Sequence, residues 1–118
     1  MEAPFRLTPA TLDVLEVLLV GRDEMHGFAI AQEAGRPTGS VYPILFRMER
    51  AGWVDSRWEA EHPEPGKPRR RFYRLNPTGL AASRPIVLDR RGRLPSARPL
   101  VRRSRPVLGF IRRRVAMS

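Results

Sequence analysis

Hydrophobic and polar positions follow two different periods along this chain. Between residues 7 and 52, apolar side chains recur every three or four positions, which is the spacing of amphipathic helices. After residue 53 the period changes to two, which is typical of half-buried strands. The order of these patterns predicts an α+β, mostly α fold with three helices, a two-stranded hairpin and the start of a fourth helix. This is the order of a winged helix-turn-helix.

Local start and stop signals bound the first two helices. Thr8 is expected to cap the first helix, and Pro9 suits its first turn, where a missing N–H does no harm. A second helix is expected over residues 26–34, and Gly35 is expected to end it in a left-handed conformation. Residues 21–25 predict a short polar connection between the two helices.

The third helix, predicted within residues 37–53 (PTGSVYPILFRMERAGW), is the segment around which the fold is organised. Its apolar side chains form one buried stripe, made of Val41, Ile44, Leu45 and Met48. Its opposite face carries small, basic and aromatic side chains, namely Gly39, Pro43, Phe46, Arg47 and Arg50. Pro37 suits a first turn, with Thr38 or Ser40 as the cap. Gly52 is expected to end the helix.

The hairpin is predicted from two alternating segments. In residues 53–60, Val54, Ser56 and Trp58 share one side, and both Trp53 and Trp58 are expected in the core. In residues 69–75, Tyr73 and Leu75 are expected to point inward. The Pro- and Gly-rich residues 62–68 between them predict the loop at the tip of the wing.

A fourth helix is expected to start at Asn76 and to end near residue 82, where the charge changes abruptly. Residues 1–83 hold eleven Lys or Arg and eleven Asp or Glu, whereas residues 84–118 hold eleven Arg and a single acid. We therefore expect a domain over residues 1–83 that folds alone, followed by an Arg- and Pro-rich tail. This tail is expected to be poorly ordered or to form one short helix. Whether it is genuine, or a frame-shifted or truncated end, stays open at this point.

The net charge of +10 indicates a polyanionic partner such as DNA, RNA, an acidic protein or an anionic membrane face. The absence of cysteine excludes disulfides, thiol catalysis and thiolate metal sites. The longest apolar run, residues 14–20, is too short to span a membrane, and no signal peptide is apparent. We expect a cytoplasmic protein with no membrane partner.

Catalytic chemistry has little support in this sequence. His26 and His62 do not have the spacing of metal ligands, and no glycine-rich phosphate loop occurs. The acids are scattered over surfaces that we predict to be exposed. We therefore expect neither an enzyme nor a cofactor or metal.

Three segments resemble the PadR family of bacterial transcriptional regulators. They are HGFAIAQE (residues 26–33), GSVYPILFRMERAGWV (39–54) and GKPRRRFYRLNPTG (66–79). The resemblance covers roughly residues 7–82. It implies a winged helix-turn-helix that binds double-stranded DNA, usually as a homodimeric repressor and sometimes in response to a phenolic or drug-like small-molecule effector.

The C-terminal part of the chain departs from the family pattern. Family members continue into long helices that make the dimer, whereas prolines at 85, 95, 99 and 106 are expected to interrupt such helices here. The resemblance therefore gives least support to the homodimer.

The third helix holds most of the residues that we expect to bind DNA. Gly39 and Ser40 are small enough for the backbone to approach a phosphate, and Tyr42, which precedes Pro43, is expected to donate to one, as the resemblance also implies. Arg47 or Arg50 is expected to contact a guanine edge or a phosphate. Phe46 is expected to pack on a thymine methyl, unless the helix is rotated and buries it.

The wing supplies the other expected contacts. Lys67, Arg69, Arg70 and Arg71 lie at the loop and at the start of the following strand, where their charges suit a phosphate backbone or a minor groove.

The leading hypothesis is sequence-specific binding of double-stranded DNA by a transcriptional repressor. The Arg-rich tail supports an alternative, an RNA- or ribosome-associated basic protein. A winged helix that serves as a protein-interaction module is a third interpretation.

Overall fold

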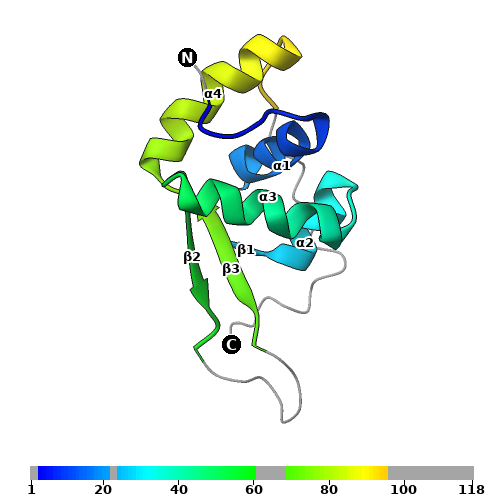
Figure 1. The fold of residues 1–118 in the computed structure, drawn as a ribbon, viewed down its shortest axis with the longest axis vertical. Helices are drawn as coiled ribbons and strands as arrows, with labels where there is room; N and C mark the ends of the chain where they lie inside the picture. The colour runs from blue at the N-terminus through cyan, green and yellow to red at the C-terminus, as the bar shows by residue number, and fades with distance from the viewer. Residues whose placement is uncertain (1–2, 22–23, 61–68, 96–118) are drawn as a thin grey trace.

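The computed structural model describes residues 3–21, 24–60 and 69–95 (Figure 1). Its helices are α1 (Pro9–Val20), α2 (Gly27–Ala34), α3 (Thr38–Arg50) and α4 (Pro77–Arg91). Its strands are β1 (Met25–His26), β2 (Val54–Trp58) and β3 (Arg71–Leu75). Figure 1 shows α3 across the middle of the molecule, with the β2–β3 hairpin projecting to one side and α4 on the other. The prediction of a mostly helical α+β winged helix is confirmed.

Side-chain caps fix the starts of two helices. The Thr8 hydroxyl accepts a hydrogen bond from the Thr11 backbone N–H at 3.1 Å, and the Asn76 side-chain oxygen accepts one from the Gly79 N–H at 2.8 Å. Gly35 follows α2 with φ of +68°, as expected for a left-handed stop. Local chemistry therefore sets these three helix ends.

The start of α3 differs from the prediction. Pro37 is the N-cap residue rather than part of the first turn, and no side chain caps the helix, so the expected cap at Thr38 or Ser40 is wrong. The Pro37 carbonyl instead accepts backbone hydrogen bonds from Ser40 and Val41, at 2.9 and 3.1 Å. Gly52, with φ of +83°, follows the helix where its end was predicted.

A third strand, β1, escaped the sequence analysis. Met25 lies in the expected polar connection, and His26 lies at the expected start of the second helix, where it is instead the residue before α2. Two residues are too few to show an alternating pattern. The sheet is antiparallel in the order β1-β3-β2, with His26 opposite Phe72, and Ser56 opposite Tyr73. β1 therefore ties the start of α2 to the wing.

The core forms where α3 crosses the other helices. The predicted stripe of Val41, Ile44, Leu45 and Met48 is at most 3% exposed. It belongs to one apolar cluster with α1, α2 and α4, which includes Leu15, Ile30 and Val87. Because its inner face is fully used by this core, α3 has only one face left for a partner.

Trp58 is not a core residue, contrary to the prediction. It is 50% exposed, whereas Val54 at the other end of β2 is 2% exposed and Trp53 is 5% exposed. Both Trp58 and Val54 lie on the same side of the strand. Trp58 is the last residue of β2, and Figure 1 shows that this end of the strand extends beyond the helices. Alternation identifies the side of a strand but not how far along it the core reaches.

The prediction that the fourth helix ends near residue 82 is wrong. α4 runs to Arg91 and passes through Pro85, and Ile86 and Val87 are 5% and 0% exposed. Pro85 cannot donate to the Ala81 carbonyl, but both residues are exposed, so water can satisfy this carbonyl. The expected boundary at residues 82–85 thus falls inside a packed helix, and residues 84–91 of the predicted tail 84–118 belong to α4. The part of the predicted tail after residue 95 lies outside the described residues.

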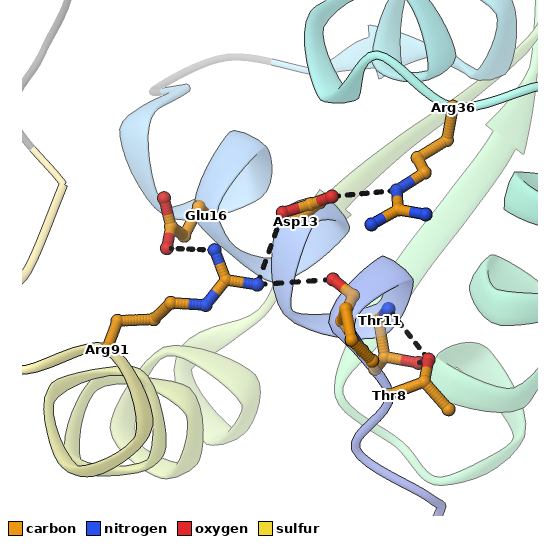
Figure 2. A network of polar contacts seen from close by, with 7 residues as sticks. Thr8, Thr11, Asp13, Glu16, Arg36 and Arg91 are labelled. Atoms are coloured by element: carbon orange, nitrogen blue, oxygen red, sulfur yellow. Dashed lines mark hydrogen bonds and ion pairs between the residues drawn. The ribbon is translucent and has the colours of Figure 1, made fainter.

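An ion-pair network holds the end of α4 against α1 (Figure 2). The Arg91 guanidinium contacts Glu16 at 3.1 Å, Asp13 at 3.2 Å and the Pro9 carbonyl at 3.2 Å. The other carboxylate oxygen of Asp13 accepts a hydrogen bond from Arg36, just before α3, at 2.7 Å. Asp13 therefore serves two arginines that are distant in sequence.

Candidate nucleic-acid interface

The outward face of α3 exposes every residue that the sequence analysis assigned to it. Phe46 is 58% exposed and Tyr42 is 43% exposed, so the alternative of a rotated helix that buries Phe46 is wrong. The remaining predicted residues on this face are also exposed, namely Gly39, Ser40, Pro43, Arg47 and Arg50. Two arginines, one tyrosine and small residues thus share one accessible surface, although none of their roles is tested by this placement.

Tyr42 is positioned by a glycine at the start of α2. A Cβ atom at Gly27 would lie 2.3 Å from Cε1 of the Tyr42 ring and 2.7 Å from its hydroxyl oxygen. Only glycine therefore leaves room for this ring in its present position. The Tyr42 hydroxyl in consequence lies beside the first turn of α2.

The predicted wing residues occupy different environments. Arg69 and Arg70 are exposed and are tied to Glu59, whose backbone oxygen accepts from Arg69 Nε and whose carboxylate accepts from the Arg70 backbone N–H, both at 3.1 Å. Arg71 is half-buried and forms an ion pair with Glu49 of α3 at 3.3 Å. Lys67 lies outside the described residues.

An open groove of about 640 Å³ separates α3 from the wing. It is lined by Tyr42, Phe46, Glu49, Arg50, Arg71 and Tyr73. Glu49 accepts a hydrogen bond from the Ser56 hydroxyl at 2.6 Å in addition to its ion pair with Arg71. Burial raises the pKa of the Tyr73 phenol, so this group stays neutral at physiological pH. Among the residues that line the groove, the one acid, Glu49, is already paired, and the cations are Arg50 and Arg71.

Two of these groove residues were missed by the sequence analysis as parts of the site. Glu49 was not assigned a role, and Tyr73 was assigned only to the inner face of the hairpin. Their position follows from the pairing of β2 with β3 and from the packing of β2 on α3, which no short-range pattern reveals. By contrast, the spacing of four residues between Phe46 and Arg50 was a usable signal, and the Arg50 guanidinium carbon lies 5.7 Å from the Phe46 ring centre.

The outer side of the sheet carries a separate aromatic row. The His26 ring stacks on Phe28 and meets Phe72 edge-on, with ring centres 6.5 and 6.0 Å apart. Burial, and then the nearby Arg70, lower the pKa of His26, so it is neutral at pH 7. Within the described ranges no three His, Asp or Glu side chains are grouped to hold a metal ion. The His26 ring packs between Phe28 and Phe72 at the start of α2.

The fold is that of a winged helix-turn-helix protein, with an exposed face of α3 beside a basic wing. The model of the transcriptional regulator PadR-like family matches residues 14–84, which is more than half of the chain. The protein belongs to this family of DNA-binding transcription regulators. The family is not one of enzymes, which confirms the expectation of a non-enzyme.

Solved structures share this fold at low sequence identity. A candidate DNA-binding protein from Ralstonia eutropha JMP134 is 26% identical, with a TM-score of 0.54 over 69% of this chain and 98% of its own. A PadR family transcription regulator from Clostridium difficile R20291 is 21% identical, with a TM-score of 0.55 over 83% and 98%. A PadR-like transcription factor from Bacteroides fragilis is 19% identical, with a TM-score of 0.53 over 71% and 84%.

A comparison with curated proteins found no significant match. Over residues 3–21, 24–60 and 69–95, no helix has the length and apolar character needed to cross a membrane.

Proposed function

We propose that this protein binds double-stranded DNA in a sequence-specific way and represses transcription. In this proposal α3 enters the major groove and the wing lies on the adjacent sugar-phosphate backbone. The observation that carries it is the exposed face of α3, which presents Tyr42, Arg47 and Arg50. Tyr42 and Arg50 also line a groove with Arg71 of β3. A single α-helix fits the major groove, which is about 12 Å wide.

Each exposed residue of α3 has a role in this proposal. Gly39 and Ser40, at the N-terminal turn, let the backbone approach a phosphate, and Tyr42 donates a hydrogen bond to another. Pro43 lies on the same exposed face and has no backbone N–H to donate. Arg47 reaches a base edge, and Phe46 packs against a thymine methyl.

The basic residues of the wing contact phosphates rather than bases. Arg69 and Arg70 are free of carboxylate ion pairs among the described residues, and Lys67 precedes them in the chain. Arg50 and Arg71 line the groove between α3 and the wing. Together these charges position the protein on the duplex without reading its sequence.

A homodimer and a small-molecule effector are parts of the same proposal. Leu88 on α4 and Leu94 after it are 49% and 42% exposed, which provides apolar surface for a second copy. A hollow of about 670 Å³, bordered by α1, β3 and the start of α4, offers space for an effector. We also propose a cytoplasmic location, because a transcription regulator acts where the DNA is.

A gel-shift comparison of duplex DNA with single-stranded RNA of equal length tests the proposed function. We expect tighter binding to the duplex, and a subset of sequences enriched from a random duplex pool. Stronger binding to RNA would favour an RNA-associated protein. Absence of binding to both would favour a protein-interaction module.

Arg47→Ala is expected to weaken binding to an enriched duplex by about 1–3 kcal/mol and to relax preference at one base position. The melting temperature should stay unchanged, because Arg47 is exposed and the buried stripe of α3 is untouched. Titration of a labelled duplex, followed by fluorescence anisotropy, measures the affinity. Repeated rounds of selection from a random duplex pool measure the base preference at each position.

Arg74→Ala is the matched control for Arg47→Ala. It removes the same charge from an exposed position on the outer side of the sheet. Equal losses in the two variants, across all duplex sequences, would contradict base reading by Arg47.

A further inference from the structure

Trp58 faces the same side of the wing as the α3 groove. In the antiparallel register, Ser56 lies opposite Tyr73, and the next row on that side pairs Trp58 with Arg71. Ser56 and Arg71 both bind Glu49 of α3, so this side of the sheet faces α3. Two residues of strand span about 7 Å, and Trp58 therefore extends the wall of the groove outward by that distance.

Trp58 packs with two arginines although half of its surface is open to solvent. The guanidinium carbon of Arg71 lies 4.9 Å from its ring centre and that of Arg69 lies 6.0 Å away. A large aromatic side chain that is 50% exposed keeps much of its surface in water, so burial is not the reason for its position. Its neighbours point to a role with the arginines.

Stacking on a ring changes what an arginine can bind. The ring occupies one face of the planar guanidinium, while the N–H groups at its edge stay available as donors. Such an arginine is held in one orientation before an anion arrives, which lowers the entropy lost on binding. The guanidinium carbon of Arg71 lies over the Trp58 ring, and the Glu49 carboxylate accepts from one of its N–H groups.

The opposite wall of the groove repeats this arrangement. Arg50 of α3 lies over the Phe46 ring at 5.7 Å, and both rings are at least half exposed. Two arginine–aromatic pairs thus flank one groove of about 640 Å³, whose single acid, Glu49, is already paired. The anion that suits this groove has regularly placed charges and apolar surface between them.

We infer that the groove between α3 and the wing holds one sugar-phosphate strand of duplex DNA, and that Trp58 is a contact residue of this site. Arg50 and Arg71 donate to phosphates, and the Trp58 ring packs on a deoxyribose between them. This inference rests on the proposed function, because it assigns a strand and a new contact residue to the same interface.

The test uses the full chain and a fluorescein-labelled duplex of random sequence. Trp58→Ala is expected to lower the affinity about tenfold, and Trp58→Phe, which keeps a ring, less than threefold. The slope of log K against log salt should fall by about 0.9 for each phosphate that the variant without the Trp58 ring no longer neutralises. Both variants should melt within a few degrees of the wild type, because the side chain is half exposed.

Tryptophan fluorescence reports on the surroundings of Trp58 itself, whereas the affinity reports on all contacts of the protein together. The protein has two tryptophans, and Trp53 is buried against Phe5 with ring centres 4.8 Å apart. Adding unlabelled duplex should therefore change the emission of the wild type but not that of Trp58→Phe, which retains only Trp53.

Each way in which the inference can fail gives a different result. Wild-type affinity of Trp58→Ala, together with weakened binding by Arg50→Ala, would overturn the role of Trp58 and leave the DNA interface standing. Absence of duplex binding by the wild type would overturn both the interface and this inference. An emission change with poly-glutamate but not with duplex DNA would assign the groove to an acidic protein segment instead.

Discussion

A chain that ends at Ser83 is expected to lose its cooperative thermal transition. Ending there removes Ile86 and Val87, which are 5% and 0% exposed in the common core. Fully burying one such side chain stabilises a protein by about 1.5–3 kcal/mol, and the whole domain has about 5–15 kcal/mol to lose. The truncation also removes Arg91 and therefore its ion pairs with Asp13 and Glu16. Circular dichroism during heating measures the transition.

The matched control is a chain that ends at Pro95. It keeps all of α4 and its packing on α1, so we expect a sharp transition close to that of the full chain. If the chain ending at Ser83 melts as sharply and within a few degrees of this control, residues 84–91 do not complete the core. The expectation that residues 1–83 fold alone would then stand.

Gly79→Ala is expected to destabilise the domain by about 3 kcal/mol, the upper part of the range for overpacking a core. A Cβ atom at residue 79 would lie 2.1 Å from the Trp53 carbonyl oxygen and 2.9 Å from Cδ2 of Leu75. This carbonyl cannot easily move, because it accepts the Asn76 N–H at 2.9 Å. The start of α4 would have to move away from Trp53, the residue that precedes β2. Urea denaturation measures the change.

Gly39→Ala is a control with the opposite expected sign. A Cβ atom there meets nothing within 4 Å, and residue 39 lies in the first turn of α3 with an ordinary helical backbone. Replacing a helical glycine by alanine gains roughly 0.5–1 kcal/mol. Equal stability of the two variants would show that the helix α4 can shift at residue 79 without cost.

The sequence was most informative where structure depends on neighbouring residues. The cap at Thr8, the helix start at Asn76, the stop at Gly35 and the two faces of α3 follow from side chains a few positions apart, and all were predicted. The exposed face of α3 was therefore identified correctly as a surface, even though its contacts with DNA stay predictions.

Long-range packing limited the rest. The change of charge was taken to end the fourth helix near residue 82, and Pro85 was expected to interrupt any longer helix. Ile86 and Val87 instead pack into a core made by residues far earlier in the chain, and this packing outweighs the one missing hydrogen bond. The constraint on Gly79 comes from Trp53, and Trp58 meets Arg71 only because β2 pairs with β3. None of these distances is encoded in a local period.

The carboxylate of Asp13 has one further consequence. Its two oxygens accept from Arg36, just before α3, and from Arg91, at the far end of α4. Because each oxygen accepts from a different arginine, this one carboxylate connects the segment before α3 to the end of α4. Asp13→Ala would therefore release both arginines at once, and Arg91 would keep its ion pair with Glu16.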